Sequence, residues 1–147
     1  MDVNSYLSGY ADGEGCFCVT FNKSKRHKFG WDIRPSFSVS QNRDRAEVLQ
    51  LLQKHFSCGT IRPDRSDKTL KFEVRSVTEL AKKVIPHFTK YPLLSSKRKD
   101  FEKFAAIVEI MYESGHLTKQ GFEKIVQLAE DINVSSKKKY TREQIKV

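Results

Sequence analysis

The sequence predicts an α+β fold in which helices cover one face of an antiparallel sheet. Residues 16–22 and 31–41 alternate between apolar and polar side chains, as half-buried strands do. Residues 101–112 and 118–132 instead repeat their apolar side chains at helical spacing. A second pair of strands follows a further helix, so the predicted order is α-β-β-α-β-β-α with a C-terminal helical extension.

The length and composition indicate one domain. The chain has 147 residues, of which 38% are hydrophobic and 31% are charged, as in soluble globular domains. We expect a single domain over 1–147, with its core at about 5–112 and the helical extension at 116–147. No apolar run approaches the roughly 18 residues of a membrane span, and the first residues lack the pattern of a secretory signal. We therefore expect an intracellular protein without a membrane partner.

The first half of the chain reads as a helix and a hairpin. A short helix is predicted at residues 5–13, with Asn4 or Ser5 as its N-cap. The strand at 16–22 and the strand at 31–41 are separated by the polar stretch "KSKRHKFG". This stretch predicts a long basic tip for the hairpin.

Two capping boxes predict the next helices. Asp44 with Glu47 precedes one helix, and Ser76 with Glu79 precedes another, which Pro86 is expected to end or bend. The apolar stripe of the first of these helices consists of Val48, Leu49, Leu52 and Phe56. Between the two helices, "TIRP" and "TLKFEVRS" alternate as the strands of a second hairpin, which turns through "DRSDK".

The cysteines favour neither a disulfide nor a zinc site. Cys16 and Cys18 would face the same side of a strand, and Cys58 is distant in sequence. We interpret all three as reduced and mostly buried. The four histidines are dispersed, which gives no support to a nuclease of the histidine and metal type.

The charge balance is typical of proteins that bind phosphates, although ribosomal, membrane-surface and heparin-binding proteins share it. The chain has 27 Lys and Arg against 18 Asp and Glu, a net charge of +9. The outer face of the sheet combines acids, bases and hydroxyls, which suits reading of DNA base edges, although solvent exposure alone also makes such faces polar. The candidate base contacts are Thr20, Asn22, Asp32, Arg34, Ser36, Ser38, Arg62, Lys71, Glu73 and Arg75. The candidate phosphate contacts are Lys23, Lys25, Arg26, Lys28, Arg98 and Lys99.

The stretch "YLSGYADGEG" at residues 6–15 carries two acids and no basic residue, although the chain as a whole is basic. Gly9 and Gly13 fall on one side of the predicted helix, which suggests close approach of another backbone. Asp12 and Glu14 sit at the carboxyl end of the helix, where carboxylates are unfavourable without a cation. Carboxylate and backbone oxygens suit Mg²⁺ better than zinc or copper. A tight turn with solubilising acids is the alternative interpretation.

The segment "LSGYADGEG" resembles the signature of the LAGLIDADG homing endonucleases, from which it departs at positions 8, 10, 11, 13 and 14. The stretches "RPSFSVSQ", "FEVRS" and "YPLLSSKRKDFEKF" resemble later family elements in order and spacing. The resemblance covers roughly residues 5–112. It implies the same α-β-β-α-β-β-α fold and an antiparallel sheet that binds DNA.

The resemblance also implies roles for single residues. Glu14 falls on the metal-binding acid, and the main-chain carbonyl of Gly13 would also face the metal, which is Mg²⁺ or, in its place, Mn²⁺ or Ca²⁺. Gln41 and Arg45 match residues that position water and phosphate, and Lys97 matches the basic residue near the developing charge. The implied catalytic set is therefore Glu14, Gln41, Arg45 and Lys97.

A single copy of the motif implies a homodimer in this family. The implied interface consists of Leu7, Gly9, Asp12 and Gly13. The expected activity is Mg-dependent cleavage of double-stranded DNA at a long pseudo-palindromic site, which leaves 3′ overhangs. The alternatives are a binding protein without catalysis, either a maturase on intron RNA or a transcription regulator, and a basic scaffold. Family members are made in bacteria or in place within a chloroplast or mitochondrion, and we expect one of these compartments.

Overall fold

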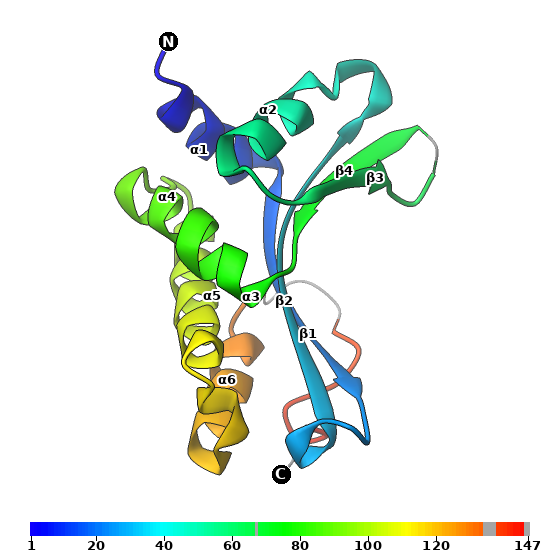
Figure 1. Ribbon diagram of the computed structural model, residues 1–147, viewed down its shortest axis with the longest axis vertical. Coiled ribbons are helices and arrows are strands. Elements are labelled where there is room, and N and C mark those ends of the chain that lie inside the picture. Colours follow the sequence, from blue (N-terminus) through cyan, green and yellow to red (C-terminus); the bar gives the residue numbers. More distant parts are fainter. Residues whose placement is uncertain (67, 134–137, 146–147) are drawn as a thin grey trace.

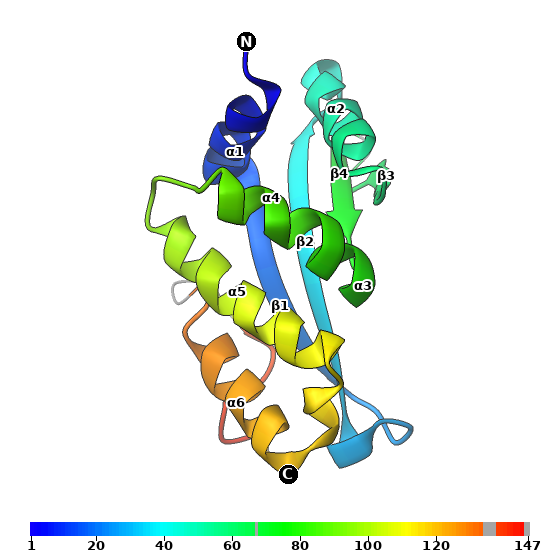
Figure 2. The same ribbon diagram turned by 60° about the vertical axis from the view of Figure 1, so that its left-hand side comes forward.

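The computed structural model describes residues 1–66, 68–133 and 138–145. Within these ranges the strands form one antiparallel sheet in the order β1-β2-β4-β3, and α4, α5 and α6 lie along one side of β1 and β2 (Figures 1 and 2). The strands are β1 (Gly15–Lys23), β2 (Trp31–Asn42), β3 (Thr60–Pro63) and β4 (Thr69–Val74). The helices are α1 (Val3–Glu14), α2 (Glu47–Phe56), α3 (Val77–Glu79), α4 (Ile85–Lys90), α5 (Lys97–Tyr112) and α6 (Lys119–Glu130). The predicted fold class and element order are confirmed.

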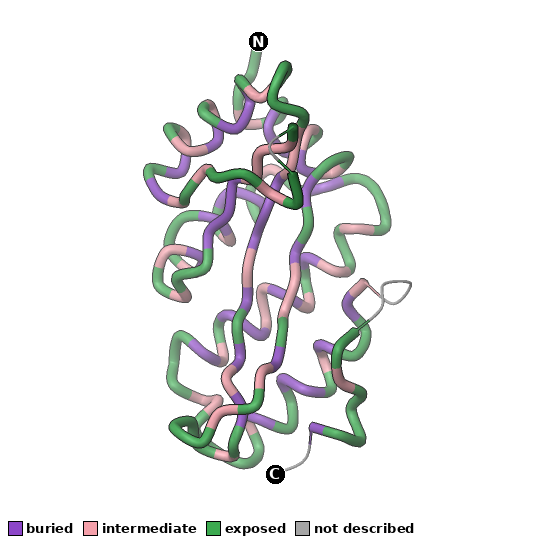
Figure 3. The backbone as a smooth tube through the Cα atoms, turned by 90° about the vertical axis from the view of Figure 1, so that its right-hand side faces the viewer, coloured by how far each residue is buried: buried purple, intermediate pink, exposed green. Residues whose placement is uncertain are grey.

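The core lies between the sheet and the helices, and aromatic rings fill its centre. Phe17 of β1 is opposite Phe37 of β2, and their ring centroids are 5.1 Å apart. Phe88 of α4 and Phe104 of α5 meet Phe17 at 5.4 and 5.3 Å. Buried and exposed positions vary along the two long strands in Figure 3, as the sequence alternation predicted.

The junction of α1 and β1 requires glycine. A Cβ on Gly15 would lie 2.7 Å from the carbonyl oxygen of Ala11, so a larger residue would disrupt the step from helix to strand. At its other end, α1 begins at Val3 and is capped by Asp2, whose carboxylate accepts from the amide of Asn4 at 3.0 Å. The expected cap at Asn4 or Ser5 was therefore wrong, because Asp2 supplies the acceptor.

Two other predictions about helix ends have opposite outcomes. Ser76 accepts from the amide of Glu79 at 3.2 Å, so the Ser76 cap of the second capping box is confirmed. The first is wrong, since residues 43–45 form a 3-10 turn and α2 follows Ala46 without a side-chain cap. Pro86 does not end its helix, because it lies in the first turn of α4, after a π-helical turn, where no amide donor is missed.

The C-terminal part of the chain packs against the same core. Phe122 and Ile125 of α6 belong to the hydrophobic cluster that contains Phe17. Residues 138–145 continue beside β1, where the ring of Tyr140 packs edge-on against Trp31 at 4.9 Å. Most of the predicted linker "SSKKK" lies outside the described residues.

The cysteines are free, as expected. Cys58 is buried and Cys18 is half-buried, but Cys16 is exposed, which corrects the expectation that all are mostly buried. Within the described ranges, every helix is too short or too polar to cross a membrane.

Candidate active site and nucleic-acid interface

The two faces of α1 have different surroundings. Leu7, Ser8 and Ala11 are buried against the rest of the chain. A Cβ on Gly9 or Gly13 would meet nothing within 4 Å, and neither glycine has a positive φ. Packing within this chain therefore does not require glycine at either position, and the face that they form is open.

Leu7, one residue of the predicted dimer interface, lies on the buried face of α1 and not on its open face. Leu7 has 0% of its surface exposed, because its side chain packs into the core of its own chain. The open face is instead bordered by apolar side chains, since Val3 is 41% exposed, Tyr6 is 40% exposed and Leu94 is 93% exposed. A bare helix face beside exposed apolar groups is suited to contact with another protein surface.

Asp12 fastens the loop before α5 to the end of α1. Its carboxylate accepts from the backbone amides of Leu94 and Ser95, each at 3.0 Å, and from the Ser95 hydroxyl. Partial burial works to raise the pKa of Asp12, but these hydrogen bonds outweigh it and lower the pKa below its usual value. This acid thus positions the loop, and with it the start of α5.

Lys97, the first residue of α5, lies against the carboxyl end of α1. Its Nζ donates to the carbonyl oxygen of Gly15 at 2.5 Å and to that of Ala11 at 3.2 Å. Both carbonyls belong to residues close to Glu14 in the sequence. The side chain of Glu14 is exposed and makes no hydrogen bond or ion pair with any residue that the structure describes. The fold therefore brings an ammonium group and a free carboxylate to the same end of one helix.

Of the other two predicted catalytic residues, only one contacts α1. Gln41 donates from Nε2 to the hydroxyl oxygen of Tyr10 at 2.5 Å, one helical turn before Glu14. Arg45 lies in the turn before α2, with 68% of its side chain exposed, and its nearest acid is its neighbour Asp44 at 3.9 Å. Among the described residues, no contact other than that with Asp44 holds the Arg45 side chain in place.

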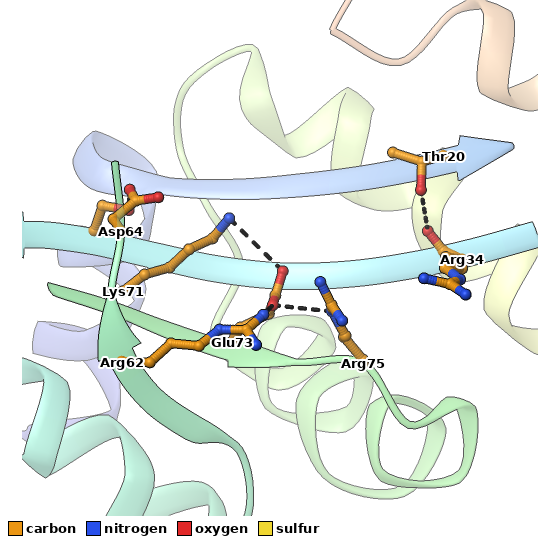
Figure 4. A network of polar contacts seen from close by, with 8 residues as sticks. Thr20, Arg34, Arg62, Asp64, Lys71, Glu73 and Arg75 are labelled. Atoms are coloured by element: carbon orange, nitrogen blue, oxygen red, sulfur yellow. Dashed lines mark hydrogen bonds and ion pairs between the residues drawn. The ribbon is translucent and has the colours of Figure 1, made fainter. Parts of the chain in front are cut away.

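The outer face of the sheet carries a buried carboxylate surrounded by cations (Figure 4). Glu73 of β4 has only 5% of its side chain exposed. Its Oε1 lies 2.7 Å from Arg62 Nη2 and 3.0 Å from Arg75 Nε, and its Oε2 lies 3.7 Å from Lys71 Nζ. The predicted face is correct, but Glu73 is too enclosed for the direct base contact that the sequence suggested.

A second acid on this face lies toward the tip of the first hairpin. Asp32 Oδ2 accepts from Arg34 Nε at 2.6 Å, and its Oδ1 lies 3.3 Å from His27 Nε2. Ser38, another predicted base contact, is only 8% exposed, because it lies between Cys16 and Glu73 on the neighbouring strands. Ser38 is therefore also too enclosed for the direct base contact that was predicted.

The remaining predicted contacts have different degrees of exposure. Thr20 is exposed, whereas Asn22 and Ser36 are half-buried. The exposed cations are Lys23, Lys25, Arg26, Lys28, Arg98 and Lys99. Three of them have neighbours within the chain, since Lys23 lies over the ring of Tyr140, Lys28 over that of Phe29, and Arg98 pairs with Glu102.

A buried polar chain behind α1 was missed in the sequence. Ser8 donates to the carbonyl oxygen of Tyr91 at 2.5 Å, so its oxygen is free to accept from His87 Nε2 at 3.1 Å. His87 Nδ1 is then the acceptor for His55 Nε2 at 3.1 Å. Burial and the nearby His55 lower the pKa of His87 to about 4. Two histidines that are dispersed in sequence thus meet, and no sequence signal pairs them.

Cys16 adjoins the site as well. A hydrogen bond from the Cys18 thiol, opposed by burial and supported by the charge of Lys97, lowers the pKa of Cys16 to about 6. The same pairing raises the pKa of Cys18. The shared strand face was foreseen from the spacing, but the lysines near it come from other elements.

The fold is that of a known class of nucleases. The sequence model of the LAGLIDADG endonuclease family matches residues 7–108. The chain belongs to this family, which confirms the resemblance noted in its first helix.

Individual relatives agree in sequence and structure. The chain is 35% identical over 130 residues to a protein from Neurospora crassa named probable intron-encoded endonuclease 2, covering 88% of this chain and 29% of the relative. It is 30% identical to the DNA endonuclease I-CeuI of Chlamydomonas moewusii, covering 82% of this chain and 56% of that protein. The chain thus spans well under two thirds of these curated relatives.

Solved structures match the whole fold. The homing endonuclease I-TnaI superimposes with a TM-score of 0.85 at 34% identity, over 99% of this chain and 95% of that one. The meganuclease I-SmaMI, solved bound to uncleavable DNA, superimposes with a TM-score of 0.85 at 32% identity, over 89% of this chain and 44% of that one.

Proposed function

We propose that this protein is a site-specific endonuclease that cleaves double-stranded DNA as a homodimer. The observation that carries the proposal is the Lys97 ammonium group fixed on the carbonyls of Ala11 and Gly15, at the end of α1 that also bears the exposed Glu14, on a helix whose other side is open. The presence of Glu14, Gln41, Arg45 and Lys97 together supports catalysis, because binding alone requires no metal chemistry. The DNA complex of the similar I-SmaMI supports DNA as the ligand.

The residues at the end of α1 fit a divalent metal ion. Glu14 offers a carboxylate and Gly13 a main-chain carbonyl, which are hard oxygen donors. No group of three or more acids, histidines or cysteines gathers within the described parts of the chain, so one chain supplies only part of a coordination shell. Mg²⁺ suits such a site because it keeps several waters, and Mn²⁺ or Ca²⁺ takes the same donors. When bound, the ion would supply Lewis acidity at the scissile phosphate.

The side chains of the chain itself position the reactants. The Lys97 ammonium group, fixed on two carbonyls, stabilises negative charge that develops on the phosphate oxygens. Gln41, held against Tyr10, orients the attacking water in line with the phosphodiester bond. Arg45 is exposed and free to bind a phosphate of the bound strand. Each protomer cuts one strand, and the offset of the two cuts leaves 3′ overhangs.

The dimer forms through the open face of α1. Gly9 and Gly13 permit the same helix of a second copy to approach closely around a twofold axis. Two Glu14 carboxylates then lie at the base of the interface, opposite the pseudo-palindromic centre of the target. The likeness to intron-encoded relatives supports synthesis within a chloroplast or mitochondrion, or in a bacterial cytoplasm.

A randomised library of duplex DNA tests the proposal, with Mg²⁺ for cleavage and Ca²⁺ for binding. We expect one long, near-palindromic sequence to be cut with Mg²⁺ and to be bound uncut with Ca²⁺. Glu14→Gln should bind this sequence normally but cleave it about 1,000-fold more slowly or worse. Glu130→Gln on α6 is the matched control, because it removes the same charge far from Glu14 in the sequence and from a different helix.

Two outcomes would contradict the proposal. Cleavage by Glu14→Gln at the normal rate would remove this acid from the mechanism. Binding without cutting by the wild type under both ions would instead indicate a regulator or a maturase, and intron RNA would then be tested as the ligand.

A further inference from the structure

Two acids on the outer face of the sheet each hold an arginine through its Nε atom. The pairs are Asp32 with Arg34, at 2.6 Å, and Glu73 with Arg75, at 3.0 Å. The arginine side chains remain 58% and 57% exposed, whereas the acids are 18% and 5% exposed. The acids are therefore enclosed anchors, and the guanidinium groups face outward.

This mode of pairing leaves a specific pair of donors free. With Nε directed at the carboxylate, the two terminal nitrogens of Arg34 and of Arg75 make no hydrogen bond with any described residue. Two parallel donors match the O6 and N7 acceptors of guanine in the major groove. A guanidinium that is already oriented also loses less side-chain freedom on binding.

The other two cations of the Glu73 cluster do not share this geometry. Arg62 donates from Nη2 at 2.7 Å, so one terminal nitrogen of its fork is already engaged. Lys71 is a single point charge 3.7 Å from the carboxylate. These two cations offset the charge of the buried acid, and Arg75 is left as the outward fork of the cluster.

We propose that Asp32 and Glu73 are positioning residues that aim Arg34 and Arg75 at guanine bases of the target. The inference rests on the proposed function, in which the outer face of the sheet lies in the major groove of DNA. Arg34 and Arg75 then determine specificity at separate base pairs of each half-site. Glu73 acts through Arg75 and does not itself read a base.

Base preference at each position, measured in the library at one fixed salt concentration, tests the assignment. Arg34→Lys and Arg75→Lys, which keep the charge but lose the fork, locate the two base pairs. We expect each to lower the preference for guanine at its own position by about tenfold. Glu73→Gln should then lose preference at the position located by Arg75→Lys, and Asp32→Asn at the one located by Arg34→Lys.

The controls separate positioning from charge and from folding. Glu130→Gln also removes an acid that pairs with an arginine, but this arginine, Arg142, lies in the C-terminal segment and not on a strand of the sheet, so the preference at the two located positions should not change. Arg62→Lys should weaken all sequences about equally. Thermal melting of each variant shows whether it is folded. If Glu73→Gln does not fold, the comparison of Asp32→Asn with Arg34→Lys tests the positioning role.

Different results would contradict the positioning roles, the guanine assignment and the proposed function. If Glu73→Gln and Asp32→Asn are folded and keep the wild-type base preferences, the positioning roles are wrong, while the endonuclease activity stands. If the located positions prefer a base pair without guanine, the guanine assignment is wrong. If the wild type binds no duplex in the library, the proposed function fails, and this inference fails with it.

Discussion

The buried and open faces of α1 differ in what determines their residues. On the buried face, Ser8 is joined to His87 and Leu7 is fully enclosed, so contacts within the chain account for both side chains. On the open face, no contact with a described residue accounts for Gly9 or Gly13. The comparison teaches that a residue whose own chain gives it no reason to be glycine points to a partner outside that chain.

Truncation on the buried face should give the largest effect on stability. Leu7→Ala removes a fully buried side chain and leaves a cavity, so the free energy of unfolding should fall by about 3 kcal/mol. Urea unfolding at several protein concentrations measures this loss, which should not depend on concentration. Leu117→Ala, at a position 44% exposed, is the control and should change stability by about 0.5 kcal/mol or less. An equal loss in both variants would contradict the buried assignment.

Enlargement on the open face should instead affect association. A Cβ at Gly13 would meet no described atom within 4 Å, so the fold should tolerate Gly13→Leu, whereas in the proposed dimer this side chain separates the two α1 helices. We expect the dissociation constant of the dimer to rise about 100-fold, equivalent to about 2.7 kcal/mol. Sedimentation over a dilution series measures it, with Gln50→Leu on the exposed side of α2 as control. Unchanged association in Gly13→Leu would exclude this face as the interface.

A substitution at the carboxyl end of α1 should have a smaller effect on stability. Asp12→Asn weakens the charge-assisted hydrogen bonds from Ser95 and Leu94, so stability should fall by about 2 kcal/mol. The loss should be present above the usual pKa of a carboxyl and vanish as the wild-type acid is itself protonated at low pH, because its folded pKa is depressed. Thermal melting measures it, and Asp131→Asn, an exposed acid, should change little.

Mild acid should also lower the stability of the protein through His87, which contacts Ser8 on the buried face of α1. The pKa of His87 is lowered to about 4 in the folded chain, so the neutral form stabilises the fold above the unfolded pKa of 6.5 and protonation costs stability below it. Between pH 7 and pH 5.5 this linkage lowers the free energy of unfolding by about 1 kcal/mol. His87→Gln should remove this part of the pH dependence. A slope identical to that of the wild type would show that His87 does not contribute it.

Local patterns predicted much of this molecule correctly. The alternation in β1 and β2 placed Phe17 and Phe37 in the core, because a strand sends successive side chains to opposite faces whatever lies beyond them. Thr118 caps α6 through the amide of Gly121, and the cap lies within one turn of the helix that it begins. Such features depend on neighbours in the sequence, so the sequence is enough to find them.

The remaining features depend on distant partners. Ser8 and His87 are 79 positions apart and are joined only when α4 packs behind α1. Glu73 was correctly assigned to the outer face, but its burial depends on Arg62 from the neighbouring strand. Leu7 was assigned to the interface from the resemblance of the motif, but its side chain is buried in its own chain, because a helix distributes adjacent residues around its axis.

The constraint on both sides of α1 also bears on how such a helix evolves. A substitution on one face disturbs the core, and in the proposed dimer a substitution on the other face disturbs the partner. On α6, by contrast, only the face with Phe122 and Ile125 is held by packing, and the exposed residues between them can change independently. In the proposed dimer α1 is constrained from two sides, and the segment at residues 7–15 that it contains indicated the family together with the later stretches of the chain.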